Sequence, residues 1–573
     1  MHNTLGGQFL TMAGTDFVDS LNQFVLDYVL GWYNRGVVMV LRAKAPRGDE
    51  CLPSATPLVP CADWYEREVK ETLGLNPVGH PNPRKLLTSD DWPEDLFPMR
   101  KDFKLEAPPP YKADAKFPFE APKEVGSFNV VPYGPYHFAI HEPIYFRFHV
   151  NGERIASVDL RAGFNYRGLE KIAETRMNYE TVPFVAERIC GICGSVHSEA
   201  YTQALERAAG FEAPDRAKWI RVLMLELERV HSHLLWLGVA THMVGFDSGL
   251  MQFWRVRDRI MFLAELLTGN RKQYGMIVPG GVRRDIREDK RQRALREVSE
   301  VLAEYEELLD AILNIGTLKV RLKGVGYLSR EDALKYSVMG PVARASGVDI
   351  DARRDYPYEA YPNFEFKTPI QSGGDVLART VIRTQDTLES LKIIKQALES
   401  LPSGPVHVPI DYIPPDITSV GLVEGPRGTD VHYLITSGQD TVYRWRVRAP
   451  TYANLPVTPL MLVGETLADA SVIIGSVDPC ISCTERMIVV DDKTGYRGSS
   501  RTKASWRVLL ERDLEVAQGR DKERACNPQL PGGGNAYTRR APGATSARLR
   551  RLHRMRGLRQ DLPAQRPDRR GEG

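Results

Sequence analysis

The chain has 573 residues, and this length predicts at least two folded domains, because a single hydrophobic core seldom grows so large. Apolar residues make up 42% and charged residues 26%, which is typical of globular proteins and excludes collagen-like, coiled-coil and wholly disordered chains. The net charge of +3 conceals an asymmetry: residues 495–573 carry 19 Lys and Arg against 8 Asp and Glu, and the rest of the chain carries −8.

The amino-terminal sequence, MHNTLGGQFLTMAGTDF, lacks the charged region and the clean apolar core of a signal peptide. No stretch of the chain approaches the roughly 20 uninterrupted apolar residues that a membrane-spanning helix needs. We therefore expect a cytoplasmic protein, and any link to a membrane must run through partner subunits.

Residues 1–105 are predicted to form a small α/β domain. A short, apolar, helix-like start is followed by a strand-like run, VVMVLRAKAP, and by a helical segment, WYEREVKETLG, that breaks at LNPVGHPNP. Residues 106–125 are rich in Pro and Lys, a composition that favours an extended, semi-rigid linker. We therefore place a domain boundary there.

Residues 126–490 are predicted to form a larger domain. FRFHV and RIASVDL flank Asn151-Gly152 with alternating apolar residues, which predicts a β-hairpin at its start. Apolar residues then recur with a 3.6-residue period in four long segments, at about 214–243, 252–269, 285–315 and 374–400. The predicted fold class is therefore α+β, with a small α/β domain in front of a large, mainly helical bundle.

Residues 491–573 form a carboxy-terminal extension that is rich in Gly, Pro and Arg and has little hydrophobic periodicity. A basic tail can bind nucleic acid or anionic membranes, but this composition favours disorder over a folded binding surface. We predict a disordered extension and no nucleic-acid partner.

Four of the seven cysteines form two CxxC pairs, Cys190 and Cys193 in ERICGICGSVHS and Cys480 and Cys483 in DPCISCTER. Four thiolates in two pairs can hold one soft or borderline metal. Structural zinc and a thioredoxin-like redox pair are the alternatives. Zinc ribbons join pairs that are tens of residues apart, whereas hundreds of residues separate these two. The spacing indicates a metal site that is central to the fold.

The motifs CGICGSVH and DPCISCTER resemble the two metal-binding signatures of [NiFe] hydrogenase large subunits. The resemblance implies a Ni-Fe centre with iron-bound CO and cyanide. In it Cys190 and Cys480 are terminal ligands of nickel, while Cys193 and Cys483 bridge nickel to iron. Arg486 stands where uptake hydrogenases usually have His, and in this the chain is similar to the energy-converting, membrane-bound group.

Residues 126–490 also resemble the quinone-site subunit of complex I, and residues 1–105 resemble its small peripheral-arm partner, although the latter domain is shorter than usual. Fusion of the two is similar to the formate hydrogenlyase and hydrogenase-4 large subunits. The alternative is a complex I-type NADH/quinone oxidoreductase subunit without hydrogenase activity. That class lacks the four cysteines, so the sequence favours the hydrogenase.

The resemblance also implies how a proton leaves the metals. Heterolytic cleavage of hydrogen needs a Lewis-acidic metal and a nearby base. By family analogy Cys480 takes the proton and passes it to Glu170, the carboxylate of RGLEK. The alternative for Glu170 is a carboxylate on a helix surface or at a helix cap.

Further side chains are expected around the metals. Arg448, in RWRVRAP, resembles the arginine that lies over the iron and hydrogen-bonds its diatomic ligands, and Arg444 and Arg446 are the other candidates. Asp247, in GFDSG, matches the carboxylate that orients such an arginine, unless it is a helix cap. His197 is expected to donate a hydrogen bond to a bridging thiolate, unless it is a core histidine.

The other three cysteines stand alone, so we expect no iron–sulfur cluster in this chain. The resemblance therefore implies electron transfer to a small [4Fe-4S] hydrogenase subunit. It also implies membrane antiporter-like subunits, a formate dehydrogenase in a formate hydrogenlyase-like complex, and a maturation endopeptidase that cuts after Arg486 and removes the extension.

Overall fold

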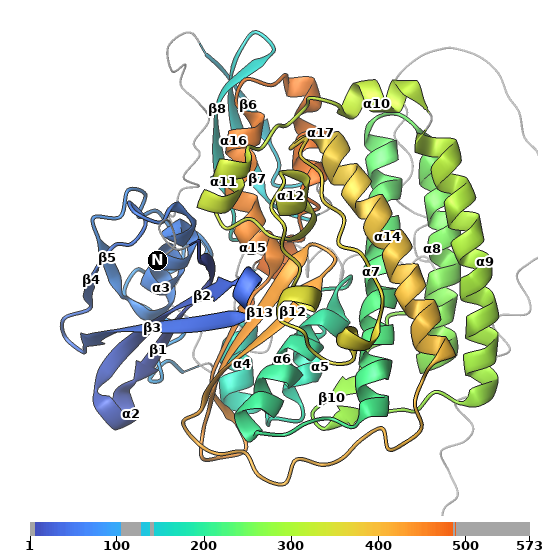
Figure 1. Ribbon diagram of the computed structural model, residues 1–573. Coiled ribbons are helices and arrows are strands. Elements are labelled where there is room, and N and C mark those ends of the chain that lie inside the picture. Colours follow the sequence, from blue (N-terminus) through green and yellow to red (C-terminus); the bar gives the residue numbers. More distant parts are fainter. Residues whose placement is uncertain are drawn as a thin grey trace, which may run out of the picture. The chain divides into compact units, whose positions relative to one another are not determined.

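The computed structural model describes residues 6–104, 128–137, 142–164, 166–313, 315–484 and 487–488 (Figure 1). It confirms the predicted class, since a sheet near the amino terminus precedes a mainly helical part that begins with a β-hairpin. The described residues belong to one compact unit, Met1–Gly498, so the division into two domains stays a prediction. The predicted linker, the carboxy-terminal extension and Arg486 lie outside the described residues.

The amino-terminal sheet has three antiparallel strands in the order β1-β2-β3: β1 (Gln8–Phe17), β2 (Gln23–Trp32) and β3 (Val37–Pro46). Helix α3 (Asp63–Leu73) packs against β1. The predicted strand and helix are β3 and α3, but the predicted helix-like start is wrong, because it falls on β1 and β2. Almost every residue of β1 is buried, so its sequence shows no alternation that would have indicated a strand.

A second antiparallel sheet opens the larger part of the chain, with strands β6 (Asn129–Tyr133), β7 (Tyr145–Asn151) and β8 (Arg154–Arg161). β7 and β8 join at Asn151-Gly152, which confirms the predicted hairpin. The buried side chains of β7 include Phe146, Phe148 and Val150, which alternate along the strand as a one-sided sheet requires.

Four long helices form the predicted bundle: α7 (Asp215–Met243), α8 (Asp247–Thr268), α9 (Glu288–Leu313) and α14 (Val376–Glu399). α7 packs against α8 and α14, and α9 packs against the same two helices (Figure 1). Most residues of α7 are buried, charged ones included, so it is the central helix of the bundle. It carries several of the charged groups described below.

A third antiparallel sheet, β12 (Thr418–Gly425), β13 (Gly428–Thr436) and β14 (Val442–Arg448), supports helix α6 (Gly194–Ala209). A Cβ atom at Gly421 would lie 1.9 Å from Ala200 O, so glycine is required for α6 to approach β12 this closely. Sequence reasoning did not assign these strands. All nine residues of β13 are buried, and a strand buried on both faces has no alternating pattern.

Shorter elements connect these parts: α2 (Val18–Leu21), β4 (Cys51–Pro53), β5 (Asn76–Val78), β9 (Tyr166–Arg167), α4 (Leu169–Arg176), α5 (Val182–Ala186), β10 (Ile277–Val278), β11 (Gly281–Val282), α10 (Gly316–Leu322), α11 (Arg330–Lys335), α12 (Gly340–Ala345), α13 (Ala352–Asp355), α15 (Pro450–Asn454), α16 (Thr458–Leu462), α17 (Ala470–Ser476), α18 (Ile481–Thr484) and β15 (Met487–Ile488). Among the described residues, none of the helices combines the length and the apolar character that crossing a membrane requires. One of the two largest core clusters lies among α6, α7, α8, α9 and α14, and it contains the four paired cysteines.

Candidate metal centre

The two cysteine pairs meet inside the protein. Cys190 Sγ lies 3.3 Å from Cys480 Sγ, Cys193 Sγ lies 3.5 Å from Cys483 Sγ, and the Sγ atoms of Cys480 and Cys483 are 3.0 Å apart. All four residues are at most 5% exposed, and none of them forms a disulfide. Four free thiols that converge at these distances are a donor set for a soft or borderline metal.

Two side chains hold the cysteine segments together. Arg167 donates hydrogen bonds to the carbonyl oxygens of Arg188 and Ile189 before the first pair, and to Ser482 O inside the second, at 2.7 Å. The carboxylate of Glu142 accepts from the backbone N–H groups of the second segment, including Ser482 N at 3.1 Å. Sequence reasoning used RGLEK only for Glu170 and missed that its arginine tethers both pairs.

The four thiols titrate as one group. Hydrogen bonds from the other three hold the pKa of the Cys190 thiol well below its usual range. The interaction with that anion raises the pKa of Cys193 and Cys480, and burial raises the pKa of Cys483, all well above the usual range. The site therefore accepts about one negative charge by itself, and four thiolates require a bound cation.

Arg427 is the arginine whose charge acts on these thiols. It lies in the turn between β12 and β13, and it donates from Nε to Asp478 O at 2.8 Å and from Nη2 to Asp478 Oδ1 at 3.0 Å. Burial opposes its charge, but Asp478 and the thiols of Cys480, Cys193 and Cys190 raise its pKa well above the usual range. Its buried Nη1 has no hydrogen-bond partner among the described residues. An unpaired buried donor beside the thiols fits a polar ligand on a bound metal.

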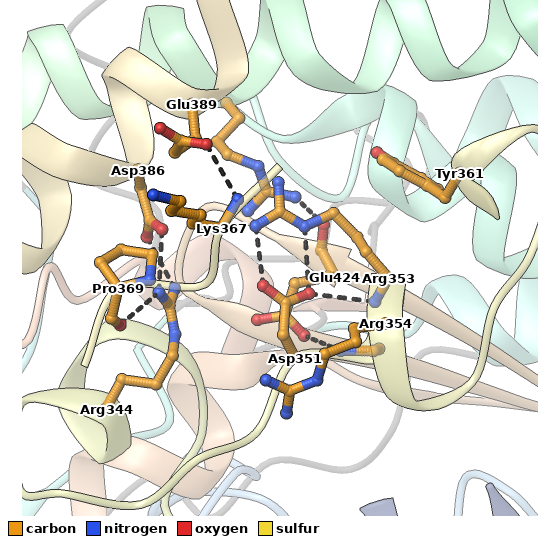
Figure 2. A network of polar contacts seen from close by, with 12 residues as sticks. Arg344, Asp351, Arg353, Arg354, Tyr361, Lys367, Pro369, Asp386, Glu389 and Glu424 are labelled. Carbon is orange, nitrogen blue, oxygen red and sulfur yellow. Dashed lines mark hydrogen bonds and ion pairs between the residues drawn. The ribbon is translucent and has the colours of Figure 1, made fainter. Parts of the chain in front are cut away.

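Figure 2 shows a network of buried charges that includes Glu424, which lies just before that turn. Arg353 lies 2.7 Å from Asp351 and 3.2 Å from Glu226, while Arg344 lies 2.6 Å from Asp386. Glu424, at the end of β12, accepts from Ala352 N at 3.1 Å and from Thr429 Oγ1 at 2.7 Å, so its carboxylate spans the turn. The backbone here is tight: a Cβ at Gly428, whose φ is +127°, would lie 2.8 Å from Gly340 N.

Arg448, expected over the metals, has a different set of partners. Its Nε donates to Leu10 O at 2.5 Å and its Nη1 to Thr429 O at 2.6 Å. Arg446 donates in the same way to Met12 O, and Arg444 to Gly14 O. Alternate side chains of β14 thus bind alternate carbonyls of β1. These three arginines join the amino-terminal sheet to β14, although Nη2 of Arg448 is also buried without a partner among the described residues. The arginine whose charge acts on the thiols is Arg427, which sequence reasoning missed although EGPRG separates two apolar runs.

Glu170 and His197 are both buried. Glu170, in the first turn of α4, is 4% exposed, which rules out the alternative of a surface carboxylate. His197 lies on α6, four residues after Cys193, and its Nδ1 is 2.6 Å from Asp430 Oδ2 and 3.2 Å from His432 Nε2. Its Nε2 is buried and has no partner among the described residues. That nitrogen is therefore available for a further hydrogen bond.

Asp247 is not in the site, and the expectation that it orients an arginine there is wrong. Its side chain is 71% exposed in the first turn of α8, and its carboxylate lies 2.6 Å from Nδ1 of His242. An aspartate at the start of a helix is stabilised by the helix dipole, which explains its position. The carboxylate that does bind the arginine beside the thiols is Asp478.

Two further buried acids, which sequence reasoning missed, lie near the first cysteine pair. Glu228 accepts from Ser195 N at 2.8 Å and Val196 N at 3.0 Å, and burial raises its pKa to about 7. Glu187 accepts from Gly275 N at 2.7 Å, and burial likewise raises its pKa to about 7. Nothing in the sequence separates such acids from the surface acids of an amphipathic helix.

Comparisons with known proteins place this geometry in a family. A model described as "Nickel-dependent hydrogenase" matches residues 167–241, and models of the respiratory-chain NADH dehydrogenase 49 Kd and 30 Kd subunits match residues 243–416 with 408–486 and residues 2–109. Formate hydrogenlyase subunit 5 of Escherichia coli is 43% identical over 85% of this chain and 86% of its own length. The chain belongs to the energy-converting [NiFe] hydrogenase large subunits.

One further relative is named as a hydrogenase, and a solved structure shows the same fold in a respiratory complex of another kind. Hydrogenase-4 component G of Escherichia coli is 43% identical over 79% of both chains. A chain of the membrane-bound sulfane sulfur reductase, an archaeal respiratory membrane complex, is 32% identical with a TM-score of 0.60, and the match covers 64% of this hydrogenase subunit and all of that chain. The complex I-type alternative is less well supported, because the nickel-dependent hydrogenase model covers the segment that contains Cys190 and Cys193.

Proposed function

We propose that this subunit interconverts hydrogen with protons and electrons at a Ni-Fe centre held by Cys190, Cys193, Cys480 and Cys483. The observation that carries the proposal is the meeting of four buried, free thiols, with neighbouring Sγ atoms 3.0 to 3.5 Å apart. When bound there, the Ni-Fe centre supplies the Lewis acidity and the redox chemistry for heterolytic cleavage.

The cysteines have different roles in this proposal. Cys190 and Cys480 would hold nickel as terminal ligands, and Cys193 and Cys483 would hold both nickel and an iron that carries CO and cyanide. The role expected of Arg448 passes to Arg427, whose charge acts on the thiols and whose unpaired Nη1 would donate to polar ligands of the bound iron. His197 donates to a bridging thiolate through its unpaired Nε2.

The proton leaves through this chain's own side chains. Cys480 takes it first, and Glu170 receives it from Cys480. The support for Glu170 is that the carboxylate is buried and lies within reach of two guanidinium groups, whose positive charges hold it in a fixed place.

The proposal includes partners because a structurally similar chain belongs to an archaeal respiratory membrane complex, and because the sequence predicts no iron–sulfur cluster in this chain. We propose a small [4Fe-4S] subunit, membrane antiporter-like subunits, formate dehydrogenase as the electron source, and an endopeptidase that cuts after Arg486. The chain then lies on the inner face of the cell membrane through those subunits. Residues 1–105 act as the peripheral-arm-like domain, and residues 126–490 as the catalytic domain.

Metal analysis and infrared absorption of the purified complex test the proposal together. We expect nickel and iron, with bands in the region of metal-bound CO and cyanide. Zinc without nickel, or a nickel-loaded complex that has no such bands, would reject it.

A further inference from the structure

Glu170 is the middle of a chain of alternating charges. Lys101 Nζ lies 2.9 Å from Glu174, Glu174 lies 3.0 Å from Arg444, and Arg444 Nη1 lies 2.9 Å from Glu170. On the other side Glu170 lies 3.4 Å from Arg446 Nη1, and Arg446 Nη2 donates to Glu68 at 2.8 Å. Six groups of alternating sign thus form one continuous series. Its two ends, Lys101 and Glu68, both come from the amino-terminal part of the chain.

The series is buried, so each charge acts strongly on the next. The side chains of the four inner groups and of Glu68 are at most 7% exposed, and that of Lys101 is 19% exposed. Burial lowers the pKa of Arg444, but the charges of Glu170 and Glu174 more than offset this and raise it above the usual value. Opposite charges in a poorly solvated site couple more strongly than they do in water.

The two arginines have little freedom to move away from Glu170. Arg444 Nε donates to Gly14 O at 2.8 Å and Arg446 Nε donates to Met12 O at 3.2 Å, both on β1. Glu68 is itself held by the hydroxyl of Tyr452 at 2.6 Å. A change of charge at either end is therefore transmitted as a change of field at Glu170, without a side-chain rearrangement.

We infer that Glu68 and Lys101 are positioning residues through which the amino-terminal part of the chain sets how readily Glu170 accepts a proton. The inference rests on the role given to Glu170 under the proposed function. Without the charge of Glu68, Arg446 acts on Glu170 alone and stabilises its anion, so Glu170 takes up a proton only at lower pH. Without the charge of Lys101, Glu174 draws more strongly on Arg444, so Glu170 takes up a proton at higher pH.

Three other charged or ionisable groups lie around the series, and the pKa of one of them, Lys171, is also lowered by the charge of Lys101. On α4, Lys171 donates to Arg100 O at 2.7 Å, and its pKa is lowered by burial. On β13, His432 acts on Glu170 through space, and burial lowers the pKa of that imidazole. On β1, Asp16 accepts from Lys101 N, which a side-chain replacement does not remove.

The test compares Glu68→Gln with Lys101→Gln in the purified complex. The first readout is the pH profile of hydrogen–deuterium exchange, which needs no electron partner. The second is the infrared band of a protonated buried carboxyl group, identified by its loss in Glu170→Gln. We expect both midpoints to shift by roughly one pH unit, downward in Glu68→Gln and upward in Lys101→Gln. Lys101→Arg keeps the charge and is expected to keep the original profile.

Glu71→Gln is the matched control for a merely structural effect. Glu71 is on the same helix, α3, and its carboxylate accepts from Leu87 N and Thr88 N, away from β14. We expect this variant to melt at a lower temperature with an unchanged pH midpoint. Equal shifts in all variants, shifts of the same sign from both ends, or no shift in either would overturn the inference.

Failure of the proposed function gives a different result. If Glu170→Gln retains exchange, the proton-transfer role of Glu170 is rejected, and the infrared band alone then decides whether the two ends act on it. If Glu170→Gln loses exchange while Glu68→Gln and Lys101→Gln keep the original midpoints, only the inference is rejected. Lys101 is partly exposed, so its variants are expected to assemble even if Glu68→Gln does not.

Discussion

The metal centre and the contact between β14 and β1 both bury many charged or ionisable groups, but they balance them differently. At the centre four thiols and Asp478 face Arg427, so the protein's own groups leave the thiols short of positive charge. In the series from Lys101 to Glu68 every carboxylate has guanidinium or ammonium partners. The difference teaches that the first region is built to receive a cation, whereas the second is complete within the chain.

The largest effect on hydrogen–deuterium exchange is expected at the metal centre itself, from Cys480→Ser. Loss of this thiolate removes a ligand and the first proton acceptor, so we expect hydrogen–deuterium exchange to fall below detection. Cys61→Ser is the matched control, since this buried cysteine contacts Ser337 and lies outside the four-thiol group. Retained exchange in Cys480→Ser, with the complex still assembled, would contradict the assignment.

Arg427→Lys tests whether the charge at the centre must also be a guanidinium. Lysine keeps the charge but loses the paired contact with Asp478 and the free Nη1 donor. We expect exchange to fall by about 10²–10³-fold with nickel content retained. The control is Arg448→Lys, which should lower the melting temperature but reduce the exchange rate less than Arg427→Lys does. A larger fall in exchange in Arg448→Lys than in Arg427→Lys would return the catalytic role to Arg448.

Arg446→Leu instead disrupts the series of charges from Lys101 to Glu68. It leaves Glu68 without its guanidinium partner and removes one of the two guanidinium groups beside Glu170. Removing one member of a buried ion network costs about 3–5 kcal/mol, and we expect a loss of that size in the free energy of unfolding. Chemical denaturation followed by circular dichroism measures it, with exposed Arg354 changed to Leu as the control. Equal stabilities would show that the series is not buried in solution.

Glu228→Gln tests the balance of charge beside the first cysteine pair. Burial raises the pKa of Glu228 from 4.5 to about 7, so between these values the unfolded chain has lost a proton that the folded chain keeps. The free energy of unfolding therefore falls as pH rises through this window and levels off above it. In the metal-free chain, the free energy of unfolding of the variant should fall by about 3 kcal/mol less than that of the unmodified chain over this pH window. An unchanged slope would place the charge of Glu228 in contact with water.

The smallest effect is expected at Asp247, which belongs to neither region. Asp247→Asn removes an exposed pair with His242, and such pairs contribute about 0–1 kcal/mol. Exchange and nickel content should match those of the unmodified complex. A tenfold loss of exchange would restore the role that the sequence suggested.

The elements that were predictable from the sequence are those with one buried face. The hairpin at Asn151-Gly152 and the four bundle helices carry a period of 2 or 3.6 residues, so their apolar patterns were readable. β1 and β13 were missed because they are buried on both faces, between layers that no local pattern reveals. The bundle was therefore predicted better than the sheets that dock against it.

The site shows the same division. Each CxxC pair indicates metal binding from a short stretch of sequence, and long-range folding brings the two pairs together. Arg427 and Arg448 both lie in arginine-containing motifs near the second pair, and sequence alone could not tell which side chain turns toward the thiols. That choice depends on the β12–β13 turn and on the alternation of β14, which directs its arginines to β1. Asp247 was misplaced because a helix end offers the same residue types as a site.

The arginines of β14 also occupy hydrogen-bond acceptors at the β1 edge of the amino-terminal sheet. The outward carbonyls of β1 at Leu10, Met12 and Gly14 each accept from a guanidinium instead of from another strand. An open sheet edge is a template for strand addition and aggregation, and long charged side chains are one way in which proteins block it. These three β1 carbonyls already accept hydrogen bonds from the same chain, so a neighbouring polypeptide cannot pair with them.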